Sequence, residues 1–514
     1  MIAARTLAGD ALIIAADAAM PAQTLSDNQN NARHLHVAIV GAGVSGIGAA
    51  IKLLDAGERD FLLFEAADEV GGVWRDNVYP GCGCDVESPL YSFSFAPNPE
   101  WSRMFSPQPE ILGYLRRVVD KFGVGPHLRL GHAIKHARWD ASARRWVLET
   151  SRGRFSADVL IAGMGALHEP VIPRFEGAER FAGAAFHSAR WDPGCSLEGK
   201  RVAVIGTGAS AIQIVPRIQP RVAKLSLFQR TPAWVVPRRD REFGPREQWL
   251  YKAIPLAQRL LRTAIYARHE ALFVGFRNPK IMSLVERFAV AYLNKTISDP
   301  GLRERLRPSF TLGCKRILLS DEYYPALAQA NVDVINDGIR EFTPAGIVDG
   351  EGREHQFDVI VYATGFHVTD PPFAAYVHGR GGRSLAEVWS DGMQAYIGTT
   401  VAGFPNLFLL TGPNTGLGHN SMILMIEAQL ELILGALEVL RDPGVCLEPR
   451  AGVQARYGEE IERGGEGTVW TAGGCSSWYL DKHGRNSTLW PWSTLAFMRR
   501  ARFEIADYLV APPS

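Results

Sequence analysis

Two glycine-rich turns, each placed between an apolar strand and a helix, constrain the fold of this chain more than any other feature. The first turn follows the apolar run 34–40 and contains Gly41, Gly43, Ser45 and Gly46. The second follows the apolar run 201–205 and contains Gly206, Thr207, Gly208, Ala209, Ser210 and Ala211. Such a turn lets the backbone approach a pyrophosphate, which the amide groups at the start of the next helix then bind. The sequence therefore predicts an α/β fold with two Rossmann-like dinucleotide-binding domains.

The end of the second strand in each domain indicates which dinucleotide binds there. Glu65 ends the strand 61–64, where an acid accepts hydrogen bonds from a ribose diol. The equivalent strand of the second domain ends at Arg230 and Thr231, without an acid. Arg230 can pair with a 2′-phosphate and Thr231 can add a hydroxyl donor; the alternative for Arg230 is a solvated surface arginine. We expect FAD on the first domain and NADPH on the second, with Gln213 near the NADPH pyrophosphate.

Composition excludes several other classes of protein. The chain has 514 residues, of which 46% are hydrophobic and 21% are charged, as in a globular protein of two or three domains. Its 55 basic and 54 acidic residues leave a net charge of +1, which argues against nucleic-acid binding. Six cysteines without a CxxC pair predict neither a disulfide scaffold nor a zinc ribbon. We expect a protein of the reducing cytoplasm; the sequence leaves its oligomeric state open.

The strand and helix patterns predict the order of the domains along the chain. We expect a disordered extension over 1–34, the first part of the FAD domain over 35–165, a linker and the first part of the NADPH domain over 166–236, a helical insertion over 237–308, the second part of the NADPH domain over 309–356, and the second part of the FAD domain over 357–514. The insertion holds fifteen basic and seven acidic residues. It is interpreted as a lid with a solvated basic face; the alternative is a surface that makes weak peripheral contact with an anionic membrane.

Two longer stretches resemble the fingerprints of one enzyme family. Residues 71–85 read GGVWRDNVYPGCGCD, and residues 181–192 read FAGAAFHSARWD. The first resembles the GGxWxxxxYPGxxxD fingerprint of class I Baeyer–Villiger monooxygenases, and the second resembles their FxGxxxHxxxW(P/D) fingerprint. The matching positions of the second are Phe181, Gly183, His187, Trp191 and Asp192. With the Ala-Thr-Gly sequence at 363–365, the resemblance extends over roughly residues 35 to 500.

The resemblance implies an enzyme that uses NADPH, FAD and O2 to oxidise a ketone. One oxygen atom enters beside the carbonyl, through a C4a-peroxyflavin, and the product is an ester or lactone. Related flavin monooxygenases oxygenate nitrogen or sulfur instead and lack the Trp191–Asp192 pair, which favours the ketone reaction here. A non-catalytic flavin-binding redox sensor is the alternative from another class. The sequence does not reveal which ketone is the substrate.

The resemblance also assigns roles to single residues. Arg316 is expected to stabilise the negative charge of the peroxyflavin and of the ketone adduct, because a guanidinium cannot lose its charge. Asp85 is expected to orient Arg316, and Lys315 to reach the NADPH 2′-phosphate beside Arg230. His187 is expected to act on domain geometry rather than on protons.

Further cofactor contacts follow from the same resemblance. Contacts with FAD are expected at Val73, Trp74, Arg75, Asp76, Asp85, Tyr91, Ile134 and Met422, and Arg316 is expected to contact NADP as well. Core packing is an equal alternative for Ile134 and Met422. The stretch 470–492 is rich in glycine and aromatic residues and is interpreted as a mobile substrate-side segment; a surface loop anchored by tryptophans is the alternative.

Overall fold

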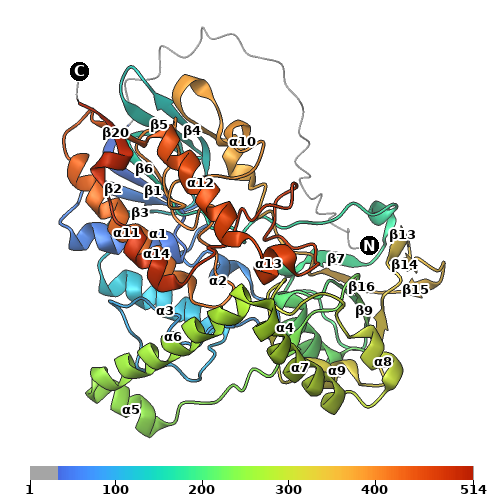
Figure 1. Ribbon diagram of the computed structural model, residues 1–514. Coiled ribbons are helices and arrows are strands. Elements are labelled where there is room, and N and C mark those ends of the chain that lie inside the picture. Colours follow the sequence, from blue (N-terminus) through green and yellow to red (C-terminus); the bar gives the residue numbers. More distant parts are fainter. Residues whose placement is uncertain (1–32, 513–514) are drawn as a thin grey trace, which may run out of the picture.

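The first of the two main β-sheets gathers strands from the N-terminal part of the chain and from residues 377–409 (Figure 1). The computed structural model describes residues 33–512. The strands of this sheet are β1 (Arg33–Val40), β2 (Phe61–Phe64), β3 (Leu128–Arg129), β4 (Ile134–Asp140), β5 (Arg145–Thr150), β6 (Gly153–Ala162), β17 (Val377–His378) and β18 (Leu407–Leu409). Their order is β17-β4-β5-β6-β1-β2-β3, and β18 also pairs with β6. The pairs β2–β1, β1–β6 and β6–β18 are parallel, as expected for a dinucleotide-binding sheet.

Helices with buried apolar sides surround this first sheet. Helix α1 (Val44–Asp55) begins directly at the first glycine turn, and its buried residues include Ile47, Ile51 and Leu53. Most of the other helices around the sheet come from later in the chain: α2 (Val73–Asp76), α3 (Gln108–Lys121), α10 (Leu385–Val388), α11 (Met422–Val439), α12 (Ala451–Gly465), α13 (Val469–Ala472) and α14 (Thr494–Arg500). A short ribbon of β19 (Cys446–Pro449) and β20 (Tyr508–Ala511) lies near the C-terminus. Arg33 and His34 already belong to β1, and the rest of the predicted extension, 1–32, lies outside the described residues.

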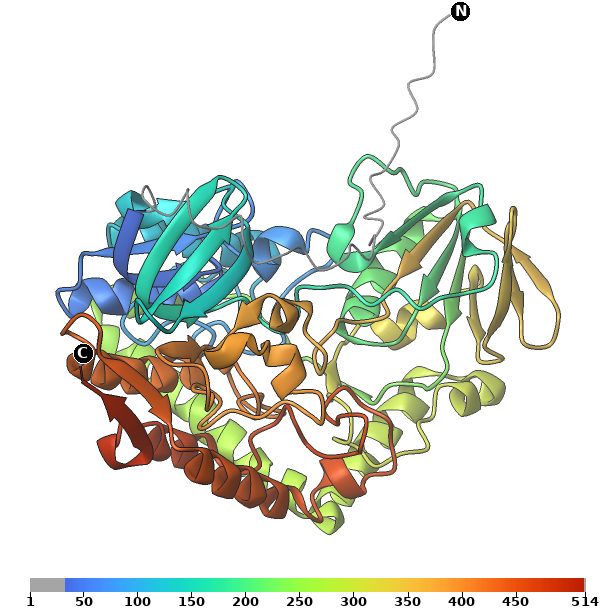
Figure 2. The same cartoon turned by 90° about the horizontal axis from the view of Figure 1, so that it is seen from above.

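The second sheet is entirely parallel and has the order β12-β9-β8-β16-β7. Its strands are β7 (Ala184–His187), β8 (Arg201–Ile205), β9 (Lys224–Phe228), β12 (Val332–Ile335) and β16 (Val359–Tyr362), and its helices include α4 (Ala209–Ile218) and α9 (Tyr323–Leu327). Smaller sheets are formed by β10 (Val235–Val236) with β11 (Leu318–Leu319), and by β13 (Ile339–Thr343), β14 (Gly346–Asp349) and β15 (Glu354–Gln356). Figure 2 shows the two main sheets side by side.

One predicted domain boundary is wrong. Residues 357–362 were assigned to the second part of the FAD domain, but β16 pairs with β8 and β7 in the second sheet. The chain therefore returns to the first domain only after Tyr362. The error has a simple cause, since a buried apolar strand reads the same whichever parallel sheet it enters.

The insertion between the halves of the second domain is helical, as predicted. It contains α5 (Pro245–Ala253), α6 (Pro255–Arg277), α7 (Pro279–Thr296) and α8 (Pro300–Arg305). Each of these helices begins with proline, whose fixed φ suits a first turn and whose missing N–H removes no helical hydrogen bond there. Among the helices of residues 33–512, none is both long and apolar enough to cross a bilayer.

Candidate active site

The first glycine turn leaves room for a phosphate group at the start of α1. Gly41 has φ +91°, and a Cβ atom there would lie 2.7 Å from the carbonyl oxygen of Gly163, so only glycine fits. Above Gly43 the nearest atom to a built Cβ is 3.6 Å away, on Gly72. Ser45 is buried in the first turn of the helix. These residues fit the pyrophosphate of a dinucleotide, with the helix amides as donors.

Glu65 ties the glycine turn to the loop that follows it. Its Oε2 atom accepts a hydrogen bond of 2.8 Å from the amide of Ala42, inside the turn. Its Oε1 atom accepts one of 2.9 Å from Nη1 of Arg75, which also bonds Asp76. Glu65 thus lies where the sequence predicted a ribose-binding acid, and Arg75 and Asp76 of α2 lie beside it.

The other expected flavin contacts divide into two groups. Trp74 lies on α2 and donates a 3.1 Å hydrogen bond from Nε1 to the hydroxyl of Tyr91, so these two residues meet beside Val73. Ile134, at the start of β4, and Met422, at the start of α11, both pack against the hydrophobic core. For the second group the structure shows the packing role, and contact with FAD stays a prediction.

The second glycine turn has the same backbone geometry as the first. Gly206 has φ +117°, and a Cβ atom there would lie 2.3 Å from the carbonyl oxygen of Ala363. Above Gly208 the space is open, since a Cβ atom would meet nothing within 4 Å. Ala209 and Ser210 follow on α4, and Ala211 is fully buried against the sheet. The open space over Gly208 fits a second pyrophosphate.

Two cations lie together beside this second turn. Burial lowers the pKa of Lys315, and the neighbouring Arg230 guanidinium lowers it further. Arg230 follows β9 and is exposed. Thr231, the next residue, accepts a 3.0 Å hydrogen bond at its carbonyl from the Thr207 hydroxyl, which joins this segment to the glycine turn. Two cations held close together, with no acidic partner among residues 33–512, suit a phosphate dianion.

Gln213 connects the two domains. Its Oε1 atom accepts a 2.9 Å hydrogen bond from the Tyr79 hydroxyl, and its Nε2 atom donates a 2.9 Å bond to the carbonyl of Gly83. A place for Gln213 near the NADPH pyrophosphate stays a prediction; in the structure its amide group holds the loop 79–83 of the first domain. That loop leads directly to Asp85. Gln213 of α4, in the second domain, therefore helps to hold the segment before Asp85 in place.

Arg316 and Asp85 form the ion pair that the sequence predicted. Nε of Arg316 donates to Oδ2 of Asp85 at 2.6 Å, and Nη2 donates to Oδ1 at 2.8 Å. Burial acts to raise the pKa of Asp85, but the charge and hydrogen bonds of Arg316 hold it below its ordinary value. Asp85 in turn raises the pKa of Arg316. Both groups therefore stay charged, and the two parallel hydrogen bonds orient the guanidinium.

His187 is suited to a structural role rather than to proton transfer. It ends β7 in the second sheet, and its Nδ1 atom accepts a 3.1 Å hydrogen bond from the amide of Ala189. Burial lowers the pKa of His187 to about 4, so the ring is neutral at neutral pH. The ring packs at 5.5 Å from that of Phe366, in the segment that returns to the first domain. The expected effect of His187 on domain geometry stays a prediction.

The remaining residues of the second fingerprint pack around β7. A Cβ atom at Gly183 would lie 2.5 Å from the carbonyl of Asp358. Phe181 packs against a cluster of the second sheet, and Trp191 lies edge-on to Phe186 at 5.1 Å. Asp192 is exposed and accepts a 2.8 Å hydrogen bond from the amide of Gly194. None of these contacts brings the four residues to Arg316 within the described part of the chain.

A disulfide and a buried tyrosine at Arg316 were not predicted from the sequence. Cys314 is bonded to Cys475. The sequence predicts no disulfide framework, and this single disulfide was not foreseen. Tyr479 follows on the same C-terminal segment and is 1% exposed. Burial raises the pKa of Tyr479 to about 12, and both charges of the Arg316–Asp85 pair act on it. Its hydroxyl has no hydrogen-bond partner among residues 33–512.

These contacts place the C-terminal segment against the Lys315–Arg316 loop; its substrate-side role stays a prediction. The available signal was weak: Cys314 directly precedes Lys315, and Cys475 lies in the segment that the family resemblance placed near the substrate. The two cysteines are 161 residues apart, and no sequence pattern links residues at that distance. The pairing could therefore not be predicted from the sequence.

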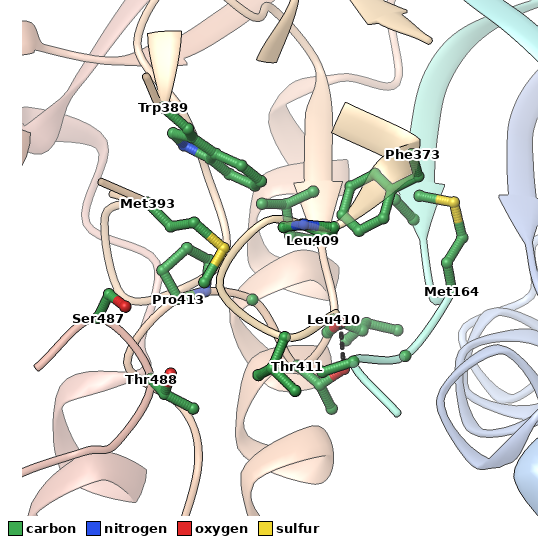
Figure 3. A pocket seen from close by; sticks show the side chains of 16 residues that line it. Met164, Phe373, Trp389, Met393, Leu409, Leu410, Thr411, Pro413, Ser487 and Thr488 are labelled. Atoms are coloured by element: carbon green, nitrogen blue, oxygen red, sulfur yellow. Dashed lines mark hydrogen bonds between the residues drawn. The ribbon is translucent and has the colours of Figure 1, made fainter. Parts of the chain in front are cut away.

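An apolar pocket opens at the carboxyl ends of β6 and β18 (Figure 3). Met164, Phe373, Trp389 and Met393 supply much of its wall, and Thr488 of the C-terminal segment borders it. Ligands of parallel α/β sheets bind beyond the carboxyl ends of the strands, and apolar walls favour an apolar ligand. The pocket is therefore suited to an apolar molecule at the edge of the first sheet.

Comparisons with known proteins agree with this geometry. A family model described as flavin-binding monooxygenase-like matches residues 34–378. The chain belongs to this family. A Baeyer–Villiger monooxygenase of Streptomyces coelicolor is 48% identical over 494 residues, covering 95% of each chain. A Baeyer–Villiger monooxygenase of Pseudomonas aeruginosa is 50% identical over 482 residues, covering 93% of this chain and 92% of the relative.

Solved structures show the same fold with NADP bound, and one of them contains FAD as well. A complex of the enzyme OTEMO with FAD and NADP covers 94% of this chain and 100% of its own, with 26% identity and a TM-score of 0.82. An oxidised steroid monooxygenase bound to NADP covers 91% and 97%, with 30% identity and a TM-score of 0.81. These findings confirm the predicted fold of two dinucleotide-binding domains, the cofactors FAD and NADPH, and the Baeyer–Villiger type of monooxygenase.

Proposed function

We propose that this chain converts an apolar ketone to an ester or lactone, with Arg316 as the catalytic cation and Asp85 as the residue that orients it. The observation that carries the proposal is the two-bond Arg316–Asp85 pair, which joins both domains and lies beside the C-terminal segment. The apolar pocket beside the first sheet supports an apolar substrate. O2 is the second substrate.

The chain's own residues bind and orient the reactants. When bound, FAD supplies the oxygen chemistry and NADPH the reducing equivalents. The turn at Gly41 binds the first pyrophosphate, and the turn at Gly206 binds the second. Lys315 and Arg230 hold the 2′-phosphate, which selects NADPH over NADH. Arg316 presents a permanent positive charge to the negative charge that develops on the substrate oxygen, at a site that the buried Tyr479 of the C-terminal segment borders.

Replacing Arg316 with Ala tests the catalytic assignment. The variant should retain FAD, because no expected FAD contact is removed, and should lose ester formation. FAD content is read from its absorbance, and NADPH loss is followed together with ester formation over linear, cyclic and aryl ketones. Measuring NADPH loss and ester formation in the same reaction distinguishes oxygen insertion from NADPH oxidation that yields no ester. Ester formation at the wild-type rate in the variant would remove Arg316 from the mechanism.

The same screen separates the two other functions. A heteroatom-oxygenating enzyme would turn over thioethers or amines and ignore every ketone. A redox sensor would retain FAD and show no substrate-dependent NADPH consumption. The Trp191–Asp192 pair and the oriented Arg316 favour ketone oxidation over both.

We also propose a cytoplasmic location and a peripheral contact of the helical insertion with membranes. Both are independent of the chemistry at Arg316. Cell fractionation tests the location. Because stable disulfides are uncommon in a reducing cytoplasm, the thiol state of Cys314 and Cys475 in extracts taken under alkylation is a second reading.

A further inference from the structure

The outward side of the helical insertion exposes large apolar side chains. Trp249 of α5 is 67% exposed, Leu256 and Leu260 of α6 are each 62% exposed, and Leu284 of α7 is also 62% exposed. Ile254, between α5 and α6, is 48% exposed. We call the exposed side chains of α5, α6 and α7 the insertion face. Figure 1 shows α5 and the start of α6 projecting from the body of the protein at the lower left.

The exposed apolar residues recur at helical spacing. On α7, Ile281, Leu284 and Phe288 are exposed at positions i, i+3 and i+7, while Met282 and Ala289 on the other side are buried in the protein. On α6, Leu256 and Leu260 are exposed one turn apart, while Ile265 and Phe273 are buried. Each helix therefore has one apolar side in the core and a second one facing outward, which folding of this chain alone does not require.

All the acidic side chains of the three helices are bonded away from the insertion face. Residues 245–296, which the structure describes in full, contain Glu247, Glu270 and Glu286 as their acids, and none of the three is exposed. Glu247 bonds Arg241 twice at 2.8 Å. Glu270 accepts a 2.9 Å bond from Asn420, and Glu286 accepts a 3.3 Å bond from the amide of Leu312.

Cations remain exposed on the insertion face: Lys252 pairs with Glu100 and Arg268 with Glu87, whereas Arg246, Arg259, Lys280 and Arg287 have no acidic partner among residues 33–512. Arg246, Lys252, Arg259, Arg268, Lys280 and Arg287 are all exposed. The whole chain has a net charge of only +1, so this concentration of positive charge is local. A second copy of the chain docked on the same face by two-fold symmetry would bring these cations against one another. The charge pattern therefore disfavours a self-dimer and favours an anionic partner.

We propose that the insertion face docks on the surface of a membrane that contains anionic phospholipids. The cations attract the lipid headgroups, and Trp249, Leu256 and Leu260 enter the boundary between headgroups and acyl chains, where indole and leucine side chains are favourable. The proposal specifies the lipid class and the residues of the peripheral contact proposed above. It requires no turnover, so it stands or falls separately from the ketone reaction.

Vesicle flotation of the full-length, FAD-loaded protein tests the proposal. The probes are vesicles of phosphatidylcholine and phosphatidylglycerol in equal parts, and vesicles of phosphatidylcholine alone. We expect binding to the first and at least about tenfold weaker binding to the second, with binding to the first weakening as salt is raised from about 0.05 M to about 1 M. Equal binding to both vesicles, or binding to neither, would overturn the proposal.

Matched variants identify the residues that bind. Trp249→Ser, Leu256→Ser and Leu260→Ser together should weaken binding to the anionic vesicles at least about tenfold. The control is Ile505→Ser with Leu509→Ser, because these residues are 57% and 47% exposed but lie near the C-terminus. FAD absorbance and circular dichroism verify folding of each variant.

Two results would refute the proposal that the insertion face binds lipid. One is equal weakening by the control pair. The other is a concentration-dependent dimer in analytical ultracentrifugation that the triple variant abolishes, since a second copy would then cover the insertion face. If the triple variant fails to fold, Arg246→Glu with Arg259→Glu, both at exposed positions without an acidic partner among residues 33–512, should produce the same loss of binding.

Discussion

Replacing Asp85 with Ala should slow ester formation by removing the group that orients Arg316. The substitution deletes both acceptors of the guanidinium, at 2.6 Å and 2.8 Å, and leaves the charge in place. Loss of one partner from a buried, hydrogen-bonded ion pair costs about 2–5 kcal/mol. The two side chains are 31% and 25% exposed, so solvent reduces the cost to about 2–3 kcal/mol here. If this energy is lost from the transition state, the rate falls about 30- to 160-fold.

The assay measures ester formation and NADPH loss with holoenzyme of known FAD content. Asp85→Asn should be slowed as well, because an amide offers one acceptor instead of two charged ones. The control is Arg241→Ala, which breaks a similar pair with Glu247, also held by two bonds of 2.8 Å, away from the site. It should stay within about twofold of the wild-type rate. An Asp85→Ala enzyme that keeps its FAD and forms ester within about threefold of the wild-type rate would refute the reasoning.

Three further predictions concern the second cofactor, the disulfide and pH. Arg230→Ala should raise the KM for NADPH by about one to two orders of magnitude while leaving the KM for NADH unchanged, because only the former has a 2′-phosphate; equal effects on both would contradict this role. Cys475→Ser should make the segment 470–492 a faster target in limited proteolysis followed by mass spectrometry, whereas Cys446→Ser, which removes a free thiol, should not. Burial lowers the pKa of His187 to about 4 from an ordinary value of about 6.5, so the unfolded chain binds more protons between these values. The thermal midpoint should therefore fall as pH decreases from about 6.5 to about 4, and His187→Asn should flatten that decline; parallel profiles for both proteins would count against it.

The glycine turns could be predicted because their requirements are local. Gly41 and Gly206 adopt positive φ and lie against a neighbouring carbonyl, which any L side chain would strike. The strands before them and the helices after them can also be predicted, because they consist of runs of apolar residues. The two dinucleotide-binding domains and the cofactor preference of each therefore follow from short segments.

Contacts between distant segments were predicted only where a family resemblance supplied them. Asp85 and Arg316 are 231 residues apart, and the fingerprint around Asp85, not its spacing, suggested the pair. No fingerprint covered the bond of Cys314 to Cys475 or the hydrogen bonds of Gln213 to the loop 79–83. The sequence around each residue of such a pair does not indicate its partner, because the fold determines which distant residues come into contact.

By itself, the sequence determined the two glycine turns, the acid at Glu65 and the absence of one beside Arg230, since each depends on neighbours in the chain. Only the tertiary structure decided that residues 359–362 join the second sheet and that Tyr479 lies beside Arg316. It also decided which side of the insertion helices faces outward. Those helices are apolar on two sides, so periodicity alone cannot say which side enters the core; that depends on the surface against which they pack.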